Sequence, residues 1–223
     1  KINVLTKNRK VNFSNSTAIG IVNFSKVFKK INPDLIAIVG DRYEIFSASI
    51  AASFCKIPIA HFHGGELTRG AMDEFMRHSI TKMSHIHLVS NEIYRKRVIQ
   101  LGENPRFVHN IGGLGVDNIK KINFLSKKDL ERRINFKLDG KIIITTFHPA
   151  TLKHKSEIKI FKEILKAYNH FKNCKIIFTG PNADIDNIKI FNLIKNFTQK
   201  NKKNSIHIKS LGRKGYLSLL KYA

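Results

Sequence analysis

Ionisable side chains are unusually dense between residues 61 and 78 of this sequence. Histidines, carboxylates, an arginine and a glycine pair stand together there as His61-Phe-His-Gly-Gly-Glu66, Asp73-Glu74 and Arg77-His78. Imidazoles and carboxylates are the side chains that most often exchange protons in enzymes. The segment follows the apolar run 57–60 directly, although a buried charge must be paired or neutralised at considerable cost. We therefore predict a working site at the end of a strand.

The elements that must position this site alternate between helices and strands. Apolar residues at helical spacing predict a helix after Ser16, which Asn32-Pro33 ends. The continuous apolar run 35–39 is typical of a strand buried on both faces. The elements expected next are a helix over 43–54, a strand over 57–62, a helix over 73–83, a strand over 86–89, a helix that Ser90 caps and Gly102 closes, and a strand over 107–111.

A second series begins after Gly112-Gly-Leu-Gly115, which breaks the alternation, and after the lysine-rich segment 118–130. We predict a domain junction there, with domains at 1–113 and 114–223. The second domain is expected to hold strands over 141–146, 175–179 and 205–208 and helices over 156–171 and 186–197. Both halves are βα repeats, which predicts an α/β fold with parallel sheets and right-handed crossovers.

Composition argues against several classes of protein. No run approaches the ~18 uninterrupted apolar residues of a membrane span, so we expect no membrane partner. Cys55 and Cys174 lie far apart beside apolar segments, which favours buried free thiols in a reducing compartment, and we expect a cytoplasmic protein.

The formal net charge of +24 raises the alternative of a nucleic-acid partner. The lysines, however, are scattered over predicted helix faces and connectors and are not gathered with aromatic residues into one motif. A solvated basic surface is the simpler interpretation, and we expect no nucleic acid. The positive charge can still help to attract a phosphorylated ligand.

Polar clusters follow four predicted strands, where ligands bind in open parallel sheets. The clusters are Gly40-Asp-Arg42, residues 61–66, Phe147-His-Pro149 and Gly180-Pro-Asn182. Any one of them alone is explained as a helix cap, and Asp41 alone is more typical of a cap or of a partner for Arg42. Four clusters in succession favour a ligand site.

Together these motifs resemble the hydrolysing UDP-N-acetylglucosamine 2-epimerases. The resemblance rests on Gly40-Asp-Arg-Tyr-Glu44, His61-Phe-His-Gly-Gly-Glu66, Asp73-Glu-Phe-Met-Arg-His-Ser-Ile-Thr81, Gly112-Gly-Leu-Gly-Val-Asp117, Thr146-Phe-His-Pro149 and Pro181-Asn-Ala-Asp184, in the family's order. It implies two Rossmann-like domains in a GT-B arrangement. The family's first βα units, with a phosphate loop, and its last part, with a diphosphate loop, are missing, so we expect both domains to be truncated and this chain alone to bind nucleotide poorly.

The resemblance also implies a reaction. Loss of UDP by C1–O cleavage and removal of the C2 proton gives a glycal, which water converts into the free 2-epimer. The substrate implied is UDP-N-acetylglucosamine or UDP-N,N'-diacetylbacillosamine, in sialic or legionaminic acid synthesis. A base with a pKa raised toward neutrality suits the proton transfer, and cations and helix N-termini suit the departing diphosphate. The family enzymes are usually homo-oligomers.

Residue roles are carried over by position. The catalytic candidates are Asp41, Glu66, Asp73, Glu74 and His148, and the substrate-binding candidates are Arg42, His63, Arg77 and Asn182. His63 departs from the family, because several members have a catalytic glutamate there; either Glu66 assumes that role or the substrate differs. For His61 and His63, structural hydrogen bonding that holds the loop stays an alternative. For Gly64 and Gly65, a turn requirement and close approach to the ligand are equally good explanations.

No Cys/His ligand spacing calls for a metal, and residues 112–115 lack the full nicotinamide fingerprint, so we expect no metal and no cofactor. Three other classes stay open. A GT-B glycosyltransferase would transfer the sugar to an acceptor, an inactive sugar-nucleotide-binding module would keep the His148 and Asn182 contacts without turnover, and a nucleic-acid binder would lose affinity steeply with salt.

Overall fold

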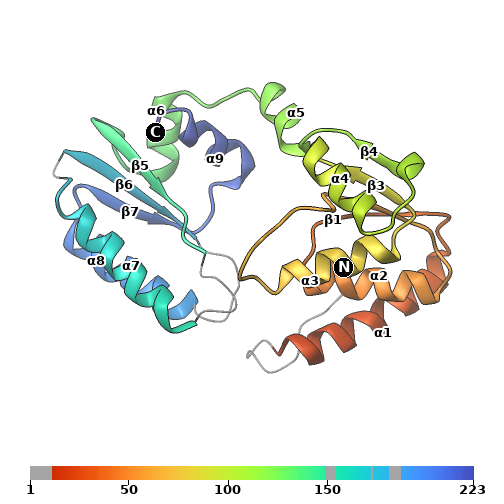
Figure 1. Cartoon of the computed structure of the whole chain (residues 1–223). Coiled ribbons are helices and arrows are strands. Elements are labelled where there is room, and N and C mark those ends of the chain that lie inside the picture. Colours follow the sequence, from red (N-terminus) through yellow and green to blue (C-terminus); the bar gives the residue numbers. More distant parts are fainter. Residues whose placement is uncertain (1–11, 149–153, 172, 181–186) are drawn as a thin grey trace. The chain divides into compact units, whose positions relative to one another are not determined.

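The computed structural model describes residues 12–148, 154–171, 173–180 and 187–223 (Figure 1). The chain divides into two units, residues 1–118 and 119–223. The predicted junction at 113/114 lies five residues earlier, at the start of helix α5 (Leu114–Lys120), which crosses this division. Each unit holds one parallel sheet with helices packed on it, as the βα repeats predict.

The first unit contains a four-stranded parallel sheet in the order β1-β2-β3-β4. Its strands are β1 (Ile36–Val39), β2 (Ile59–Phe62), β3 (Ile86–Val89) and β4 (Val108–Asn110). Its helices are α1 (Phe13–Ile31), α2 (Tyr43–Phe54), α3 (Asp73–Met83) and α4 (Glu92–Gln100), followed by the 3-10 turn η1 (Pro105–Phe107) and α5. The bounds of α2, α3 and β3 coincide with those that the sequence predicts.

The core of the first unit lies on one face of its sheet. Ile38 and Ile59 pack against α1, α2 and α3, while Val89 and Val108 pack against Val98 of α4. Strand register places these four sheet residues on the same side. The prediction that the first strand is buried on both faces is therefore wrong for the described residues. Val39, which points to the other side, is 53% exposed.

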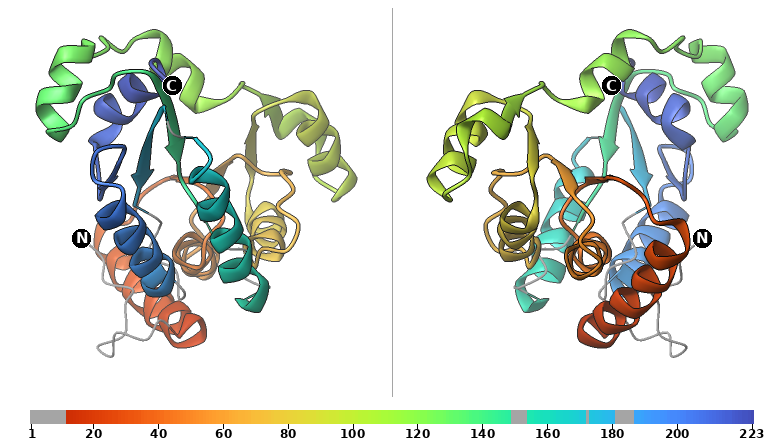
Figure 2. Two further views of the ribbon diagram at one scale, coloured as in Figure 1. Left: turned by 90° about the vertical axis from the view of Figure 1, so that its left-hand side faces the viewer. Right: turned by 90° about the vertical axis from the view of Figure 1, so that its right-hand side faces the viewer.

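The second unit contains a three-stranded parallel sheet in the order β5-β6-β7. The strands are β5 (Lys141–Thr145), β6 (Cys174–Thr179) and β7 (Ser205–Ile208), and the helices are α6 (Lys127–Ile134), α7 (His154–Tyr168), α8 (Asn187–Lys200) and α9 (Gly212–Leu220). The side chains of β6 alternate between two cores: Ile177 packs with α6 and α9, whereas Ile176 and Phe178 pack with α7 and α8. Figure 2 shows α7 and α8 from both sides of the molecule.

The helix α6 was missed, because the lysine-rich segment 118–130 resembles a connector. It is nevertheless a capped amphipathic helix: Ser126 Oγ accepts the Asp129 N–H, and Leu130 and Ile134 are buried. Cys55 and Cys174 are free thiols, as expected, but only Cys174 is buried, whereas Cys55 is partly exposed. Among the described residues, no helix is both long and apolar enough to cross a membrane.

The Gly64-Gly65 turn after β2 is required by packing within the protein. Gly65 has a φ of 79°, and a Cβ there would lie 2.6 Å from the Tyr94 carbonyl oxygen and 2.9 Å from Val98 Cγ2. A Cβ on Gly64 would lie 3.1 Å from Thr81 Oγ1. Of the two explanations open from sequence, the structure supports the turn and its fit against α3 and α4.

Gly65→Ala is expected to destabilise the first unit much more than Gly70→Ala. Both glycines have a φ of 79°, but a Cβ on Gly70 meets nothing within 4 Å. Gly70→Ala should therefore cost only the backbone strain, about 1 kcal/mol, and Gly65→Ala should add roughly 1–3 kcal/mol for the clash. Urea unfolding of the two variants measures the difference. Equal losses of unfolding free energy would contradict the packing requirement.

Candidate active site

Polar residues of the first unit gather where β1 and β2 end. Asp41 follows β1 by two positions, after Gly40 in the left-handed region at a φ of 94°. His63 and Glu66 follow β2, which is the neighbour of β1 in the sheet. The carboxyl ends of parallel strands share one edge, so these residues and the first turn of α3 form a single group.

Arg77 is the buried centre of this group, with 5% of its side chain exposed. Its Nη2 pairs with Asp41 Oδ2 and donates to Thr68 Oγ1 at 2.8 Å. Its Nη1 donates to the Glu66 carbonyl oxygen at 2.8 Å and to Glu74 Oε2 at 3.3 Å. A buried guanidinium is tolerated because its donors are satisfied and its charge is paired. The structure thus brings together the predicted residues of three separate segments.

The acidic pair of α3 stands in the first turn of that helix, where the helix dipole favours negative charge. Glu74 Oε2 also accepts the Thr68 N–H, and Glu74 Oε1 lies 3.6 Å from His78 Nε2. Asp73 is half-buried beside it. These contacts hold the Glu74 carboxylate at the same edge as Asp41.

Arg42 lies next to Asp41 and is 37% exposed. Its Nε donates to Glu44 Oε2 at 3.4 Å, and its guanidinium lies 5.9 Å from the centre of the Tyr43 ring. The side chain is therefore at the surface of the group, unlike Arg77. Its predicted contact with substrate stays a prediction.

His63 and Glu66 contact one another directly. His63 Nδ1 lies 2.8 Å from Glu66 Oε1, and Ser90 Oγ donates to the same oxygen at 3.1 Å. The predicted cap role of Ser90 is wrong: Asn91 caps α4 by accepting the Tyr94 N–H at 2.9 Å. Ser and Asn are both good N-cap residues in isolation. Ser90 directly follows β3, and there its hydroxyl bonds Glu66 instead of the helix.

His61 is a structural residue of this edge. It is fully buried, its Nε2 lies 3.3 Å from the Gly40 carbonyl oxygen, and its Nδ1 lies 3.5 Å from Thr81 Oγ1. Burial lowers the pKa of His61 to about 4, although the hydrogen bond to Gly40 opposes this. His61 is thus a neutral support that holds the backbone beside Asp41.

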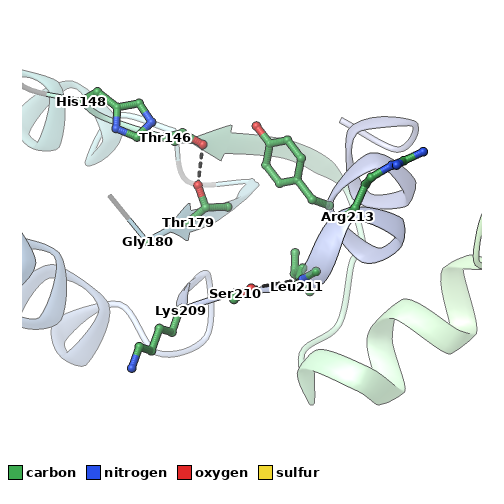
Figure 3. A pocket seen from close by; sticks show the side chains of 10 residues that line it. Thr146, His148, Thr179, Gly180, Lys209, Ser210, Leu211 and Arg213 are labelled. Carbon is green, nitrogen blue, oxygen red and sulfur yellow. Dashed lines mark hydrogen bonds between the residues drawn. The ribbon is translucent and has the colours of Figure 1, made fainter. Parts of the chain in front are cut away.

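The second unit has an open pocket of about 450 Å³ where its strands end (Figure 3). Its lining residues come from the ends of all three strands and the start of α9: Thr146, His148, Thr179, Gly180, Lys209, Ser210, Leu211, Gly212, Arg213 and Tyr216. The Thr146 and Thr179 hydroxyls bond one another across β5 and β6. A Cβ on Gly180 would lie 2.7 Å from the Lys209 carbonyl oxygen, so only glycine allows this close approach.

Of the residues predicted in this half, His148 is exposed and lines the pocket, whereas Asn182 lies outside the described residues. Sequence reasoning missed Lys209, Arg213 and Tyr216. A signal for Lys209 was present in the sequence, because it directly follows the third strand. Ligands bind beyond the carboxyl ends of parallel strands, and this applies to the third strand as it does to the others. Cations, hydroxyls and a phenol ring suit a ligand with phosphate groups and a ring.

Comparison with known proteins agrees with the motifs. The UDP-N-acetylglucosamine 2-epimerase family matches residues 1–223. The chain is 44% identical to the GDP/UDP-N,N'-diacetylbacillosamine 2-epimerase (hydrolyzing) of Campylobacter jejuni, over 99% of this chain and 57% of that protein. It is 42% identical to the polysialic acid biosynthesis protein P7 of Escherichia coli, over 93% and 53% of the two.

The fold is similar to the crystal structure of the UDP-GlcNAc 2-epimerase from Neisseria meningitidis bound to UDP-GlcNAc. The TM-score is 0.80 at 19% identity, with 98% of this chain and 60% of that chain covered. This confirms the predicted fold class, α/β with Rossmann-like units of the GT-B type. The chain spans about half the length of the curated relatives that it matches.

Removal of the Arg77 guanidinium is expected to destabilise the first unit strongly. Arg77→Met leaves Asp41 and Glu74 without their cation and should lower the free energy of unfolding by about 3–5 kcal/mol. Arg106→Met, at an exposed arginine of the same unit, should change it by less than about 0.5 kcal/mol. Urea unfolding measures both, and equal effects would show that Arg77 is not the centre of the group.

His61 is expected to make the first unit less stable in acid. Below its ordinary value of 6.5 the unfolded chain protonates His61, but the folded protein does so only near pH 4. Stability therefore falls as the pH drops from 6.5 to about 4, by up to ~3 kcal/mol for this residue. His61→Gln should flatten the unfolding free energy over this window. His109→Gln, at an exposed histidine, should leave the slope unchanged; a slope unaltered by His61→Gln would contradict the assignment.

Proposed function

Because the chain belongs to the UDP-N-acetylglucosamine 2-epimerase family, we propose that the protein is a hydrolysing UDP-sugar 2-epimerase. It converts a UDP-2-acetamido sugar and water into UDP and the free 2-epimer, through a glycal. UDP-N-acetylglucosamine and UDP-N,N'-diacetylbacillosamine are the two sugars of this class that we propose, with a place in sialic or legionaminic acid synthesis. The relatives named as hydrolysing enzymes and as a polysialic acid biosynthesis protein support this choice.

The observation that carries the proposal is the Arg77-centred group of carboxylates at the strand ends of the first unit. Epimerisation through a glycal removes a proton from C2, which is not acidic, and later returns one to it, so groups that transfer protons must be held close to C2. Asp41 and Glu74 are held by one buried guanidinium and one helix, and Glu66 is held through its carbonyl oxygen. We assign proton transfer to this group.

We assign nucleotide binding to the second-unit pocket. Lys209 and Arg213 supply positive charge, and the Thr146 and Thr179 hydroxyls supply hydrogen bonds. C1–O cleavage leaves a new negative charge on the diphosphate, which cations and hydroxyl donors stabilise. His148, whose predicted place is near the diphosphate, lies in the same pocket. Its 450 Å³ is of the size usual for sites of small ligands.

Turnover in D₂O tests the proposal on the complete protein. Incubation with each of the two UDP-sugars should release UDP and give a free 2-epimer that carries deuterium at C2, both detected by NMR. Asp41→Asn should lower kcat by roughly 10²–10⁴-fold, because an amide cannot transfer a proton as a carboxyl group does. Two outcomes would contradict the proposal. Sugar release that needs an acceptor would indicate a glycosyltransferase, and binding without release or exchange would indicate a sugar-nucleotide-binding module.

A further inference from the structure

Three polar side chains around the end of β2 form a continuous chain of hydrogen bonds. Ser90, at the end of β3, donates its hydroxyl to Glu66 Oε1 at 3.1 Å, and the same oxygen lies 2.8 Å from His63 Nδ1. The His63 and Glu66 side chains are 28% and 32% exposed. The chain therefore runs from the neighbouring strand to an imidazole that solvent can reach.

The contact with Glu66 determines the tautomer of His63. A carboxylate only accepts hydrogen bonds, so the proton of the neutral imidazole must be on Nδ1 and the lone pair on Nε2. Nε2 makes no hydrogen bond to any other residue in the described part of the chain. The remaining nitrogen is thus an available proton acceptor. This arrangement of carboxylate, oriented imidazole and free nitrogen is the one that enzymes use to aim a histidine base.

Glu66 itself is fixed from both sides. Its carbonyl oxygen accepts Arg77 Nη1 at 2.8 Å, while its carboxylate is held by Ser90 and His63. Oε1 of Glu66 therefore serves to orient the His63 ring. Its contacts are those of a residue that positions a neighbour.

The backbone of His63 is strained, which indicates a constraint on its side chain. Its φ is 66°, in the left-handed region that non-glycine residues rarely occupy. Such a conformation is unfavourable for a residue with a side chain and persists only where the surroundings over-determine it. Here the His63 N–H donates to the Leu88 carbonyl oxygen at 2.9 Å, and the following glycine pair fits tightly against α3 and α4.

On the basis of the proposed function, we propose that His63 Nε2 is the base that removes the C2 proton, and that Glu66 and Ser90 are positioning residues for it. This exchanges the roles that the resemblance implies for His63 and Glu66. It explains how a histidine can stand where several family members have a catalytic glutamate.

The step balances without a further reactant. Nε2 takes the C2 proton, the C2–H electron pair forms the C1=C2 bond, and the C1–O bond breaks so that its pair leaves with UDP. His63 then gives its proton to solvent. Inversion at C2 requires a proton from the other face of the glycal, which we assign to the Asp41–Glu74 group. Water adds hydroxide at C1 and replaces the proton that this group donated.

The first measurement needs no turnover. In the unliganded protein, ¹⁵N NMR of the histidine rings should show that the neutral form of His63 carries its proton on Nδ1. Glu66→Ala should populate the other tautomer, because Nδ1–H then lacks its acceptor. A neutral ring protonated on Nε2 in the unmodified protein would overturn the proposal whatever the protein catalyses.

The second measurement uses kinetics with a UDP-2-acetamido sugar in D₂O. His63→Gln should lower kcat at least 100-fold with KM changed less than threefold, and His63→Glu should restore part of kcat, since a carboxylate can also accept the proton. Glu66→Gln should lower kcat about tenfold when His63 is present and have no further effect when His63 is glutamine, because the two act as one unit. His170→Gln, at an exposed histidine of the second unit, is the control and should match the unmodified protein.

The outcomes separate the two proposals. Turnover by the unmodified protein that His63→Gln leaves intact would overturn the role of His63 and keep the proposed function. No turnover with either UDP-sugar would overturn the proposed function and the role of His63 with it. Independent, additive losses from His63→Gln and Glu66→Gln would show that Glu66 does not act through His63.

Discussion

The burial of one guanidinium among carboxylates is the interaction on which the first unit's site depends. Arg77 is placed on α3, yet its partners follow β1, lie in the loop after β2, and stand one turn back on its own helix. A lysine could not reproduce this, because its single ammonium lacks the planar fork that reaches several acceptors at fixed angles. The Arg77 ion pair and hydrogen bonds thus tie the loop after β2 and the end of β1 to α3.

The side chains around Arg77 are of two kinds, buried supports and partly exposed groups that a ligand can reach. His61 and Arg77 are buried and bonded to protein atoms, so they shape the edge of the sheet. His63, Glu66 and Glu74 keep a quarter to a third of their side chains exposed. Preorganisation of this kind lowers the cost of orienting reactive groups when a ligand binds.

Much of the fold could be predicted because its signals are local. The bounds of α2, α3, β3 and β7 follow from apolar periodicity and from terminating residues within a few positions. The burial of β1 could not be predicted, because it depends on which elements cover each face of the sheet. The cap of α4 could not be predicted for a similar reason. The Ser90 hydroxyl bonds Glu66, which lies 24 residues away in the sequence, and Asn91 caps the helix in its place.

Among the site residues, too, some can be predicted from local sequence and others depend on contacts between distant segments. Strand-end clusters predict Asp41, Glu66 and His148 as site residues, whereas Arg77 is a central ion-pairing residue only because Asp41, 36 residues distant, reaches it. Lys209 could have been predicted from its place after the third strand, but Arg213 belongs to no motif and becomes a neighbour of Thr146 only when β7 pairs with β6.

Glu66 belongs to both networks, through its carbonyl oxygen on one side and its carboxylate on the other. A backbone shift that moves the whole of Glu66 would therefore release Arg77 and misdirect His63 in a single event. The loop that carries Glu66 thus couples the two networks. The His63 imidazole and the carboxylates bound to Arg77 keep or lose their alignment together.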